Sequence, residues 1–275
     1  MQTLLFVDWK VNPEIFSIGG FALRYYSVMF VLAFGCSYYI MDYIFKRENA
    51  SLDLLSKLFI YVFLGTLIGA RLGHALFYEF GYFKNHLLEI ILPFKFPNGS
   101  FEWTGYRGLA SHGGAIGILT AVFLYCKKYK QSFLWTIDRL VIVIALAGFF
   151  IRIGNLFNSE IIGTPTSVPW AFIFYNVDAI PRHPAQLYEA LLNLITFLVL
   201  WLIYKRNTKS CTSGFLFGCF LVLVFTSRFI VEFVKENQEA FENNWLINLG
   251  QLLSIPFILF GLYLMIVKFK KEVQG

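Results

Sequence analysis

The sequence contains few charged residues, and this excludes most soluble classes of protein. Asp, Glu, Lys and Arg make up 15% of its 275 residues, against about 25% in a typical soluble chain. Hydrophobic residues make up 57% before glycine is counted, whereas soluble chains reach about 45–50% with glycine included. The net charge of +6 does not indicate nucleic-acid binding, because the basic residues are scattered between apolar runs. The composition therefore predicts an integral membrane protein.

Motifs for bound metals, nucleotides and redox chemistry are also missing. No pair of the four cysteines, Cys36, Cys126, Cys211 and Cys219, has the C-x-x-C spacing of a metal or redox site. The sequence has no cluster of metal ligands and no phosphate-binding loop of the Walker type, so we expect neither a metal nor a cofactor. No internal repeat or soluble domain is visible. The first residues lack the basic segment of a cleaved signal peptide.

Long apolar runs dominate what is present. A helix needs roughly 20 apolar residues to cross a bilayer, and seven runs qualify. They cover about residues 18–44, 58–80, 109–126, 134–157, 186–204, 214–234 and 247–267. We therefore predict an all-α, polytopic membrane protein of about seven transmembrane helices. Residues 1–275 form one integral-membrane domain in this prediction.

The lysines and arginines predict the orientation of these helices. Twelve of the 23 lie in alternate connections, after the first, third, fifth and seventh runs. The positive-inside rule places those connections in the cytoplasm, which puts the N-terminus outside and the C-terminus inside. The connections at 81–108, 158–185 and 236–244 then face outward. The first of these is rich in aromatic residues, and we expect it to lie along the membrane interface.

Four apolar runs each carry an arginine: Arg24, Arg71, Arg152 and Arg228. A guanidinium does not lose its proton, so inside a membrane it needs a partner or a ligand. The predicted topology places all four toward the outer leaflet, and only Asp138 and Arg139 lie at the inner end. We interpret this convergence as a site for an anion at the outer leaflet.

Each polar motif also has a plain structural explanation. The glycines that follow His112 suit tight packing of helices, although they do not explain a histidine suited to proton transfer. Arg228 and Glu232 lie one helical turn apart, so they either neutralise each other or the carboxylate holds the arginine for a ligand. The sequence leaves both readings of this pair open.

A second set of polar residues borders the 158–185 connection. Arg152, Asn155 and Asn158 share a helix face; they suit either a clamp to Glu160 or Glu232, or phosphate recognition by a guanidinium fork. We favour phosphate recognition. On the other side of the connection, the spacing of Arg182, Gln186 and Glu189 predicts that they line one face of the fifth helix.

Together these motifs resemble those of the bacterial prolipoprotein diacylglyceryl transferase family. The resemblance is carried, in chain order, by Leu23-Arg-Tyr-Tyr-Ser27, Gly69-Ala-Arg-Leu-Gly73, Gly108-Leu-Ala-Ser-His-Gly-Gly114, Arg152-Ile-Gly-Asn-Leu-Phe-Asn158, Arg182-His-Pro-Ala-Gln-Leu-Tyr-Glu189, Arg228-Phe-Ile-Val-Glu-Phe233 and Gly250-Gln-Leu-Leu-Ser-Ile-Pro256. This chain departs from the family at Ile151, where glycine is usual, and at Ser159, within a usual Asn-Gly-Glu. It also has Val224 where some members carry tyrosine.

The resemblance implies a transferase that moves the diacylglyceryl group of phosphatidylglycerol to the lipobox cysteine of an exported prolipoprotein. This is the first step of lipoprotein maturation, and it releases glycerol phosphate. The implied catalytic residues are His112, Arg152 and Arg228. The implied substrate-binding residues are Tyr26, Arg71, Asn155, Asn158, Glu160, His183, Gln186 and Glu232. The implied location is the bacterial plasma (inner) membrane, with the active site toward the outer leaflet and both substrates entering from the bilayer.

The main alternative is a transporter or channel for an anion, because membrane arginines also line transport pathways. Transporter sites tend to lie near the midplane, between repeats and broken helices. Here the predicted site is off-centre and no repeat is visible. A purely structural scaffold would leave the placement of His112 and Gln186 unexplained.

Overall fold

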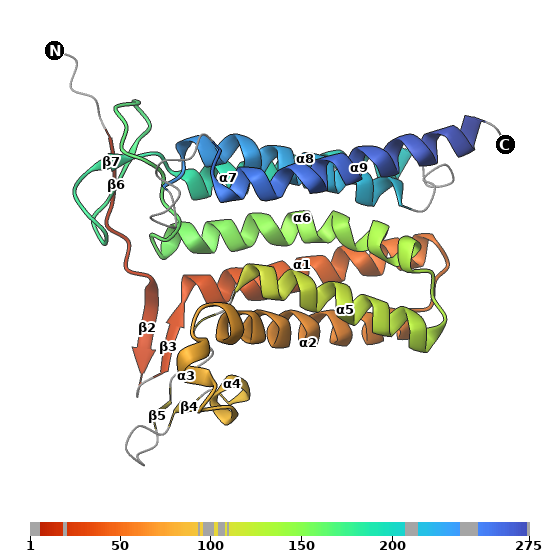
Figure 1. Cartoon of the computed structure of the whole chain (residues 1–275), viewed down its shortest axis with the longest axis horizontal. Coiled ribbons are helices and arrows are strands. Elements are labelled where there is room, and N and C mark those ends of the chain that lie inside the picture. Colours follow the sequence, from red (N-terminus) through yellow and green to blue (C-terminus); the bar gives the residue numbers. More distant parts are fainter. Residues whose placement is uncertain are drawn as a thin grey trace. The chain divides into compact units, whose positions relative to one another are not determined.

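The structure of the protein is a computed structural model that describes residues 6–18, 21–92, 94–95, 102–103, 108, 110–206, 214–236 and 247–273. Most of these residues are helical (Figure 1), which confirms the prediction of an all-α, polytopic membrane protein. Cys211, most of the acidic connection at 236–244 and part of the 81–108 connection (93, 96–101 and 104–107) lie outside the described residues.

Six described helices are long and apolar enough to cross a membrane. They are α1 (Tyr25–Arg47), α2 (Leu52–Phe77), α6 (Phe133–Phe157), α7 (Ala185–Arg206), α8 (Phe215–Val231) with the following 3-10 turn η2 (Glu232–Val234), and α9 (Leu249–Val273). The third predicted run forms α5 (Ser111–Tyr129). This helix is not among the six, because His112 at its start and Lys127 and Lys128 at its end shorten its apolar stretch. A seventh crossing stays a prediction.

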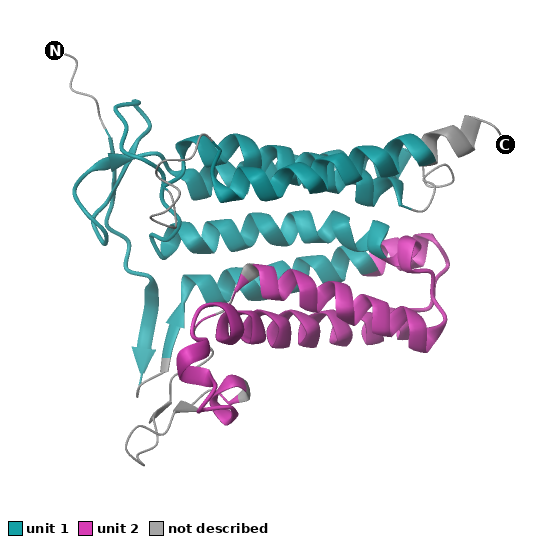
Figure 2. Ribbon diagram, viewed as in Figure 1, with its two compact units in different colours: residues 1–41, 137–275 teal, residues 42–136 magenta. Residues whose placement is uncertain are grey.

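The chain divides into two compact units (Figure 2). One comprises residues 1–41 and 137–275, and the other comprises residues 42–136. The boundaries fall inside α1 and near the start of α6. The predicted site residues Arg71 and His112 belong to the second unit, and the others belong to the first.

The second unit is built on close contact between α2 and α5. The Cβ of an alanine at Gly69 would lie 2.4 Å from the carbonyl oxygen of Gly113, and one at Gly117 would lie 2.0 Å from that of Gly65. Only glycine lets two helix backbones approach so closely. The structural explanation of the glycines after His112 is therefore correct. The same unit contains α3 (Phe80–Phe83), α4 (Leu88–Ile91), β4 (Phe94–Lys95) and β5 (Glu102–Trp103).

In the first unit, the helices α6, α7, α8 and α9 contact one another at their ends. The C-terminal ends of α6 and α8 meet the N-terminal ends of α7 and α9 through the side-chain contacts described below. At the opposite end, Asp138 accepts hydrogen bonds from the backbone N–H groups of Gly214 at 2.6 Å and Phe217 at 2.8 Å. Asp138 thus satisfies free donors at the start of α8. Of the two charged residues predicted at the inner end, Asp138 and Arg139, the first therefore has a structural role in capping α8.

The 158–185 connection and the N-terminal residues contain strands that the sequence did not predict. β1 (Val7–Trp9) runs parallel to β6 (Phe172–Phe174), and β6 pairs antiparallel with β7 (Pro181–Arg182). Trp9 packs on a buried cluster of Leu156, Ile162 and Phe174, and its indole N–H donates to the carbonyl of Leu156 at 3.1 Å. This connection is therefore an ordered cap beside the end of α6.

A hairpin of β2 (Glu14–Ile18) and β3 (Phe21–Arg24) precedes α1. It corrects the prediction that the first apolar helix contains Arg24. That side chain is 40% exposed and pairs with Glu14 at 2.9 Å, while α1 begins only at Tyr25. The predicted start of the first helix, at about residue 18, lies too close to the N-terminus, because the strand Phe21–Arg24 is mostly apolar like the helix that follows it.

The contact between α2 and α5 leads to a stability prediction. Gly69→Ala forces the two helices apart, and we expect it to lower the free energy of unfolding by about 1–3 kcal/mol. The control is Gly35→Ala in α1, where an added Cβ meets nothing within 4 Å. Thermal unfolding in detergent measures both. Equal melting temperatures for the two variants would contradict this account.

Candidate functional site

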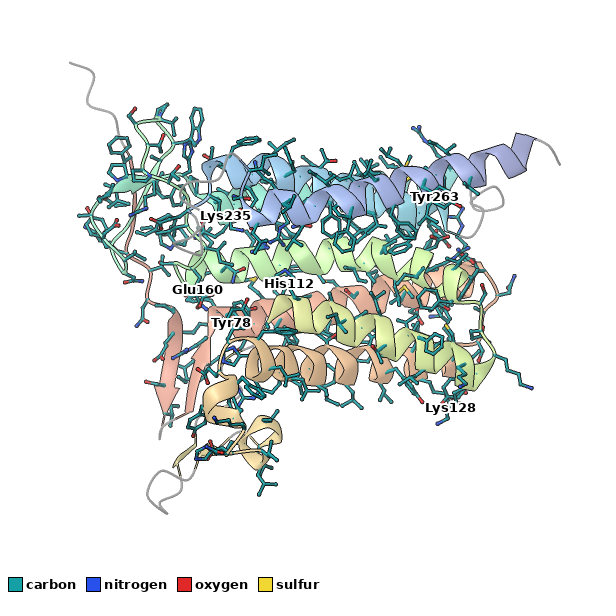
Figure 3. The ribbon with its side chains drawn as sticks, viewed as in Figure 1. Tyr78, His112, Lys128, Glu160, Lys235 and Tyr263 are labelled. Atoms are coloured by element: carbon teal, nitrogen blue, oxygen red, sulfur yellow. The ribbon has the colours of Figure 1, made fainter. Side chains whose placement is uncertain are left out.

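Five charged side chains of the first unit form a continuous series of ion pairs; one of them, Lys235, is labelled in Figure 3. The Arg152 Nε atom on α6 lies 2.9 Å from Glu189 Oε2 on α7. Lys235, directly after η2, lies 3.6 Å from Glu189 Oε1 and 3.0 Å from Glu232 Oε1. Arg228 Nε on α8 lies 3.6 Å from the same Glu232 oxygen. We call these five residues the ion-pair chain.

The start of α9 fixes one carboxylate of the ion-pair chain. Asn248 donates from Nδ2 to Glu232 Oε2 at 3.2 Å. A Cβ at Gly250 would lie 2.5 Å from Glu232 Oε1, so glycine lets the backbone of α9 approach the carboxylate. Gln251 reaches α8 through a hydrogen bond to the carbonyl of Phe229 at 3.3 Å. Four helices therefore meet at the ion-pair chain.

Burial differs along the ion-pair chain. The side chains of Lys235, Glu189 and Glu232 are 3%, 6% and 8% exposed, whereas those of Arg152 and Arg228 are 21% and 30% exposed. Buried charges must be paired, and the three inner groups satisfy each other. The two arginines occupy the accessible ends, so they are the members that a ligand can reach.

Both arginines use Nε for their ion pairs. Within the part of the chain that the structure describes, their terminal nitrogens donate no hydrogen bond. The Arg152–Glu189 contact is close, but Glu189 Oε2 is not aligned for a hydrogen bond within the described chain. Three cations against two carboxylates leave the ion-pair chain with one net positive charge. This arrangement suits an anion with two or more acceptor oxygens, such as a phosphate ester.

Glu160 is held by Asn155, Asn158 and Gln186, and we call these four residues the Glu160 group. Asn155 donates to Glu160 Oε2 at 3.1 Å, and Asn158 donates to Glu160 Oε1 at 3.2 Å. Gln186, on α7, donates to the backbone carbonyl of Glu160 at 2.6 Å. Both asparagines thus hold a carboxylate, and Arg152 pairs with Glu189 instead of Glu160 or Glu232.

Tyr26, in the first turn of α1, lies against the last turns of α6. A Cβ at Gly154 would come within 2.8 Å of the Tyr26 ring, so the ring packs on the backbone of α6. The neighbouring Tyr25 ring stacks on Phe157, with ring centres 4.4 Å apart. Tyr26 therefore packs on the stretch of α6 that also carries Arg152 and Asn155.

The structure separates Arg182 from the helix face predicted for it. Arg182 lies in β7, and α7 begins at Ala185. Its terminal nitrogens contact Asp178 at 2.7 Å and Glu236 at 3.2 Å, and the hydrogen bonds from Arg182 hold the pKa of Asp178 below its usual value. The prediction of a common face was wrong because the strand interrupts the helical spacing. Gln186 and Glu189 do lie on α7.

His183 lies among aromatic neighbours, and none of its described contacts belongs to the ion-pair chain. Its Nδ1 atom is 3.1 Å from the hydroxyl of Tyr188, which also accepts a hydrogen bond from the indole of Trp170 at 2.8 Å. Burial lowers the pKa of His183 and so favours its neutral form. These contacts support the entry into α7.

In the second unit, Arg71 holds the end of α4. Its Nε donates to the carbonyl of Ile90 at 3.0 Å, and its Nη2 donates to that of Glu89 at 2.7 Å. These bonds satisfy free carbonyls at the end of α4. His112 lies exposed in the first turn of α5. The substrate roles of Arg71 and His112 stay predictions.

Two members of this site escaped the sequence interpretation. Lys235 and Asn248 were not assigned, and Glu189 was noticed only for its spacing. Lys235 follows Glu232 by three residues, which is a helical ion-pair spacing, so a signal was present. Asn248 precedes the last apolar run and carried no such signal.

A family model described as "Prolipoprotein diacylglyceryl transferase" matches residues 13–267. The chain belongs to this family. A phosphatidylglycerol–prolipoprotein diacylglyceryl transferase of Bacteroides fragilis is 47% identical over 98% of both chains. Proteins of the same name from Tolumonas auensis and Chloroherpeton thalassium are each 43% identical over 97% or more of both chains.

The end of α6 has a backbone conformation at position 159 that suits glycine better than the serine present. Ser159 has a φ of 54°, in the left-handed region that favours glycine. The N–H of Ser159 bonds to Leu156 and that of Glu160 bonds to Asn155, at 3.1 and 3.0 Å. This is the Schellman pattern of helix ends. It turns the chain so that Glu160 faces the two asparagines.

Ser159→Gly should therefore stabilise this member of the prolipoprotein diacylglyceryl transferase family. We expect the free energy of unfolding to rise by about 0.5–1 kcal/mol, because the left-handed conformation no longer carries a side chain. Thermal unfolding in detergent measures the change. The same substitution at Ser56, inside α2, is the control and should lower stability. A loss of stability at Ser159 would refute the explanation.

Gly163 joins the Glu160 group to the ion-pair chain. Its N–H donates to the carbonyl of His183 at 2.9 Å, and it forms an isolated bridge with Lys235. A Cβ here would lie 2.6 Å from the carbonyl oxygens of both His183 and Val234. The chain segments around Gly163 are therefore packed too tightly for any side chain.

Gly163→Ala should push the backbone at Lys235 away from the cap. We expect transferase activity to fall by about tenfold or more, because misplaced catalytic groups lose much of their effect. Initial rates on a lipobox peptide measure this. Gly81→Ala is the control, since an added Cβ there meets nothing within 4 Å. Unchanged activity in Gly163→Ala would show that the packing at Gly163 does not position the site.

Proposed function

We propose that this protein is a phosphatidylglycerol–prolipoprotein diacylglyceryl transferase. The observation that carries the proposal is the ion-pair chain, whose two partly exposed arginines keep their terminal nitrogens available at one end of the membrane helices. Membership of the family and the names of its relatives support the same reaction. The protein acts on phosphatidylglycerol and on the lipobox cysteine of an exported prolipoprotein.

The reaction exchanges one bond for another. The cysteine sulfur attacks the glycerol carbon that joins the diacylglycerol to the phosphate. A carbon–sulfur bond forms as the carbon–oxygen bond to phosphate breaks, and glycerol phosphate leaves with the electron pair. The thiol proton passes to a base. The products are a diacylglyceryl thioether on the protein and glycerol phosphate, and no oxidant or cofactor is required.

Negative charge gathers on the departing phosphate in this reaction, and the arginines meet that need. Arg152 and Arg228 bind the phosphate oxygens through their terminal nitrogens, while Glu189 and Glu232 hold each Nε. A preorganised donor of this kind contributes about 2.7–4 kcal/mol of transition-state stabilisation in other enzymes. Replacing either arginine should therefore lower the rate by about 10²–10³.

The attacking cysteine needs a base, because a free thiol has a pKa of about 8.5. His112 either accepts this proton or positions the thiol, since imidazole titrates near neutral pH. Tyr26, Asn155, Asn158, Gln186 and the Glu160 carboxylate orient the phosphatidylglycerol headgroup. The family resemblance also assigns Arg71 and His183 to substrate binding; in the structure Arg71 holds the end of α4 and His183 contacts Tyr188.

The site faces the outer leaflet of the bacterial plasma membrane in this proposal. Lys205 and Arg206 occupy the last turn of α7, at the opposite end of that helix from Glu189, and positive charge marks the cytoplasmic side. Phosphatidylglycerol and the signal peptide both reside in the bilayer. Both substrates therefore enter between helices, and residues 1–275 act as a single catalytic domain.

Mass spectrometry tests the proposal. Purified protein is incubated with phosphatidylglycerol and a synthetic lipobox peptide, and the peptide should gain one diacylglyceryl unit on its cysteine. Arg152→Ala should reduce the rate by about 10²–10³. Arg24→Ala is the matched control, because Arg24 pairs with Glu14 outside the membrane helices, and its rate should stay at the wild-type value. An unmodified peptide from folded wild-type protein, with anion flux into vesicles, would favour the transporter instead.

A further inference from the structure

Lys235 is the one member of the ion-pair chain that contacts both carboxylates. Its Nζ atom lies 3.0 Å from Glu232 and 3.6 Å from Glu189. Glu232 in turn contacts Arg228, and Glu189 contacts Arg152. A single buried ammonium group therefore connects the two arginines that the proposed function places on the phosphate.

We propose that Lys235 is a positioning residue that sets the placement of Arg152 and Arg228 relative to each other, so that both bind one phosphate group. The proposal rests on the proposed function. Lys235 is 3% exposed at its side chain, so it acts through the carboxylates and does not itself contact the phosphate. The position of Lys235 in the sequence does not by itself indicate this role.

Electrostatics explains why a cation is needed at this point. Glu189 and Glu232 are both buried and both approach the same nitrogen. Without a cation between them, two buried carboxylates would repel each other, and each would bind its own arginine more closely. The guanidinium groups would then be drawn back from the phosphate. An ammonium group suits the position because it is a compact charge with three donors.

The backbone fixes where the ammonium group is placed. Lys235 bridges to Gly163. On either side, Thr164 N–H donates to the carbonyl of Val234 at 2.9 Å, and Glu236 N–H donates to that of Ile162 at 3.3 Å. These bonds belong to the main chain, so a change of the Lys235 side chain leaves them in place. The ordered cap thereby sets the position of Lys235, and Lys235 sets the arginines.

The test compares Lys235→Met, which keeps an unbranched side chain without the charge, with Lys235→Arg, which keeps the charge. Two quantities are measured: kcat for lipidation of the peptide, and the inhibition constant of glycerol phosphate, the product that carries the phosphate. In Lys235→Met both should worsen by about tenfold, a typical size for coupling within one charged network. The KM for the peptide should stay unchanged. Lys235→Arg should recover most of both losses.

Lys10→Met is the matched control. Lys10 belongs to the same unit and lies over the ring of Tyr175 at 4.3 Å, away from the ion-pair chain, so both quantities should equal those of the wild type. If Lys235 only stabilises the fold, Lys235→Met will lower the melting temperature, yet the folded enzyme will keep its kcat and its inhibition constant. That result would overturn the proposal.

Removal of a buried cation can prevent folding. If Lys235→Met does not fold, Lys235→Gln carries the test, because its amide leaves a hydrogen-bonding group in the buried position. The same losses are expected, and wild-type values would overturn the proposal. Failure of the proposed function is a separate result. In that case wild-type protein lipidates no peptide, and the protection of each variant against unfolding by glycerol phosphate alone decides the role of Lys235.

Discussion

An arginine inside a membrane protein keeps its charge, and the structure around the site depends on that constraint. Arg152 and Arg228 require carboxylates, and those carboxylates are buried and require a cation of their own. Lys235 supplies it. Because each carboxylate contacts Nε, the remaining guanidinium nitrogens stay available. The same ion pairs that make the charges tolerable therefore leave a site that can bind an anion.

Close approach of backbones places these charges. Gly250 lets α9 approach Glu232, and Gly163 lets the cap approach Lys235. The left-handed residue Ser159 turns the chain after α6, which brings Glu160 to Asn155 and Asn158. Positions without room for a side chain thus determine where charged side chains lie. The site is built as much by small residues and turns as by its polar residues.

The sequence predicted the helices well because apolar runs are long and charges mark their ends. It also predicted the contact of Arg228 with Glu232, since that pair is local. It did not predict which carboxylate holds Arg152, because Glu189 lies 37 residues away on another helix. The strands β1, β6 and β7 were missed, since each is two or three residues long. Arg182 was misplaced for the same reason.

The central claim is that Arg152 and Arg228 bind a phosphate group as forked donors rather than as simple charges. Arg152→Lys tests this most directly, because lysine keeps the charge and loses the fork. The measurement is kcat for transfer to a lipobox peptide by folded protein. The account predicts a fall of about tenfold or more. Full activity of Arg152→Lys would contradict it and would leave only a requirement for positive charge.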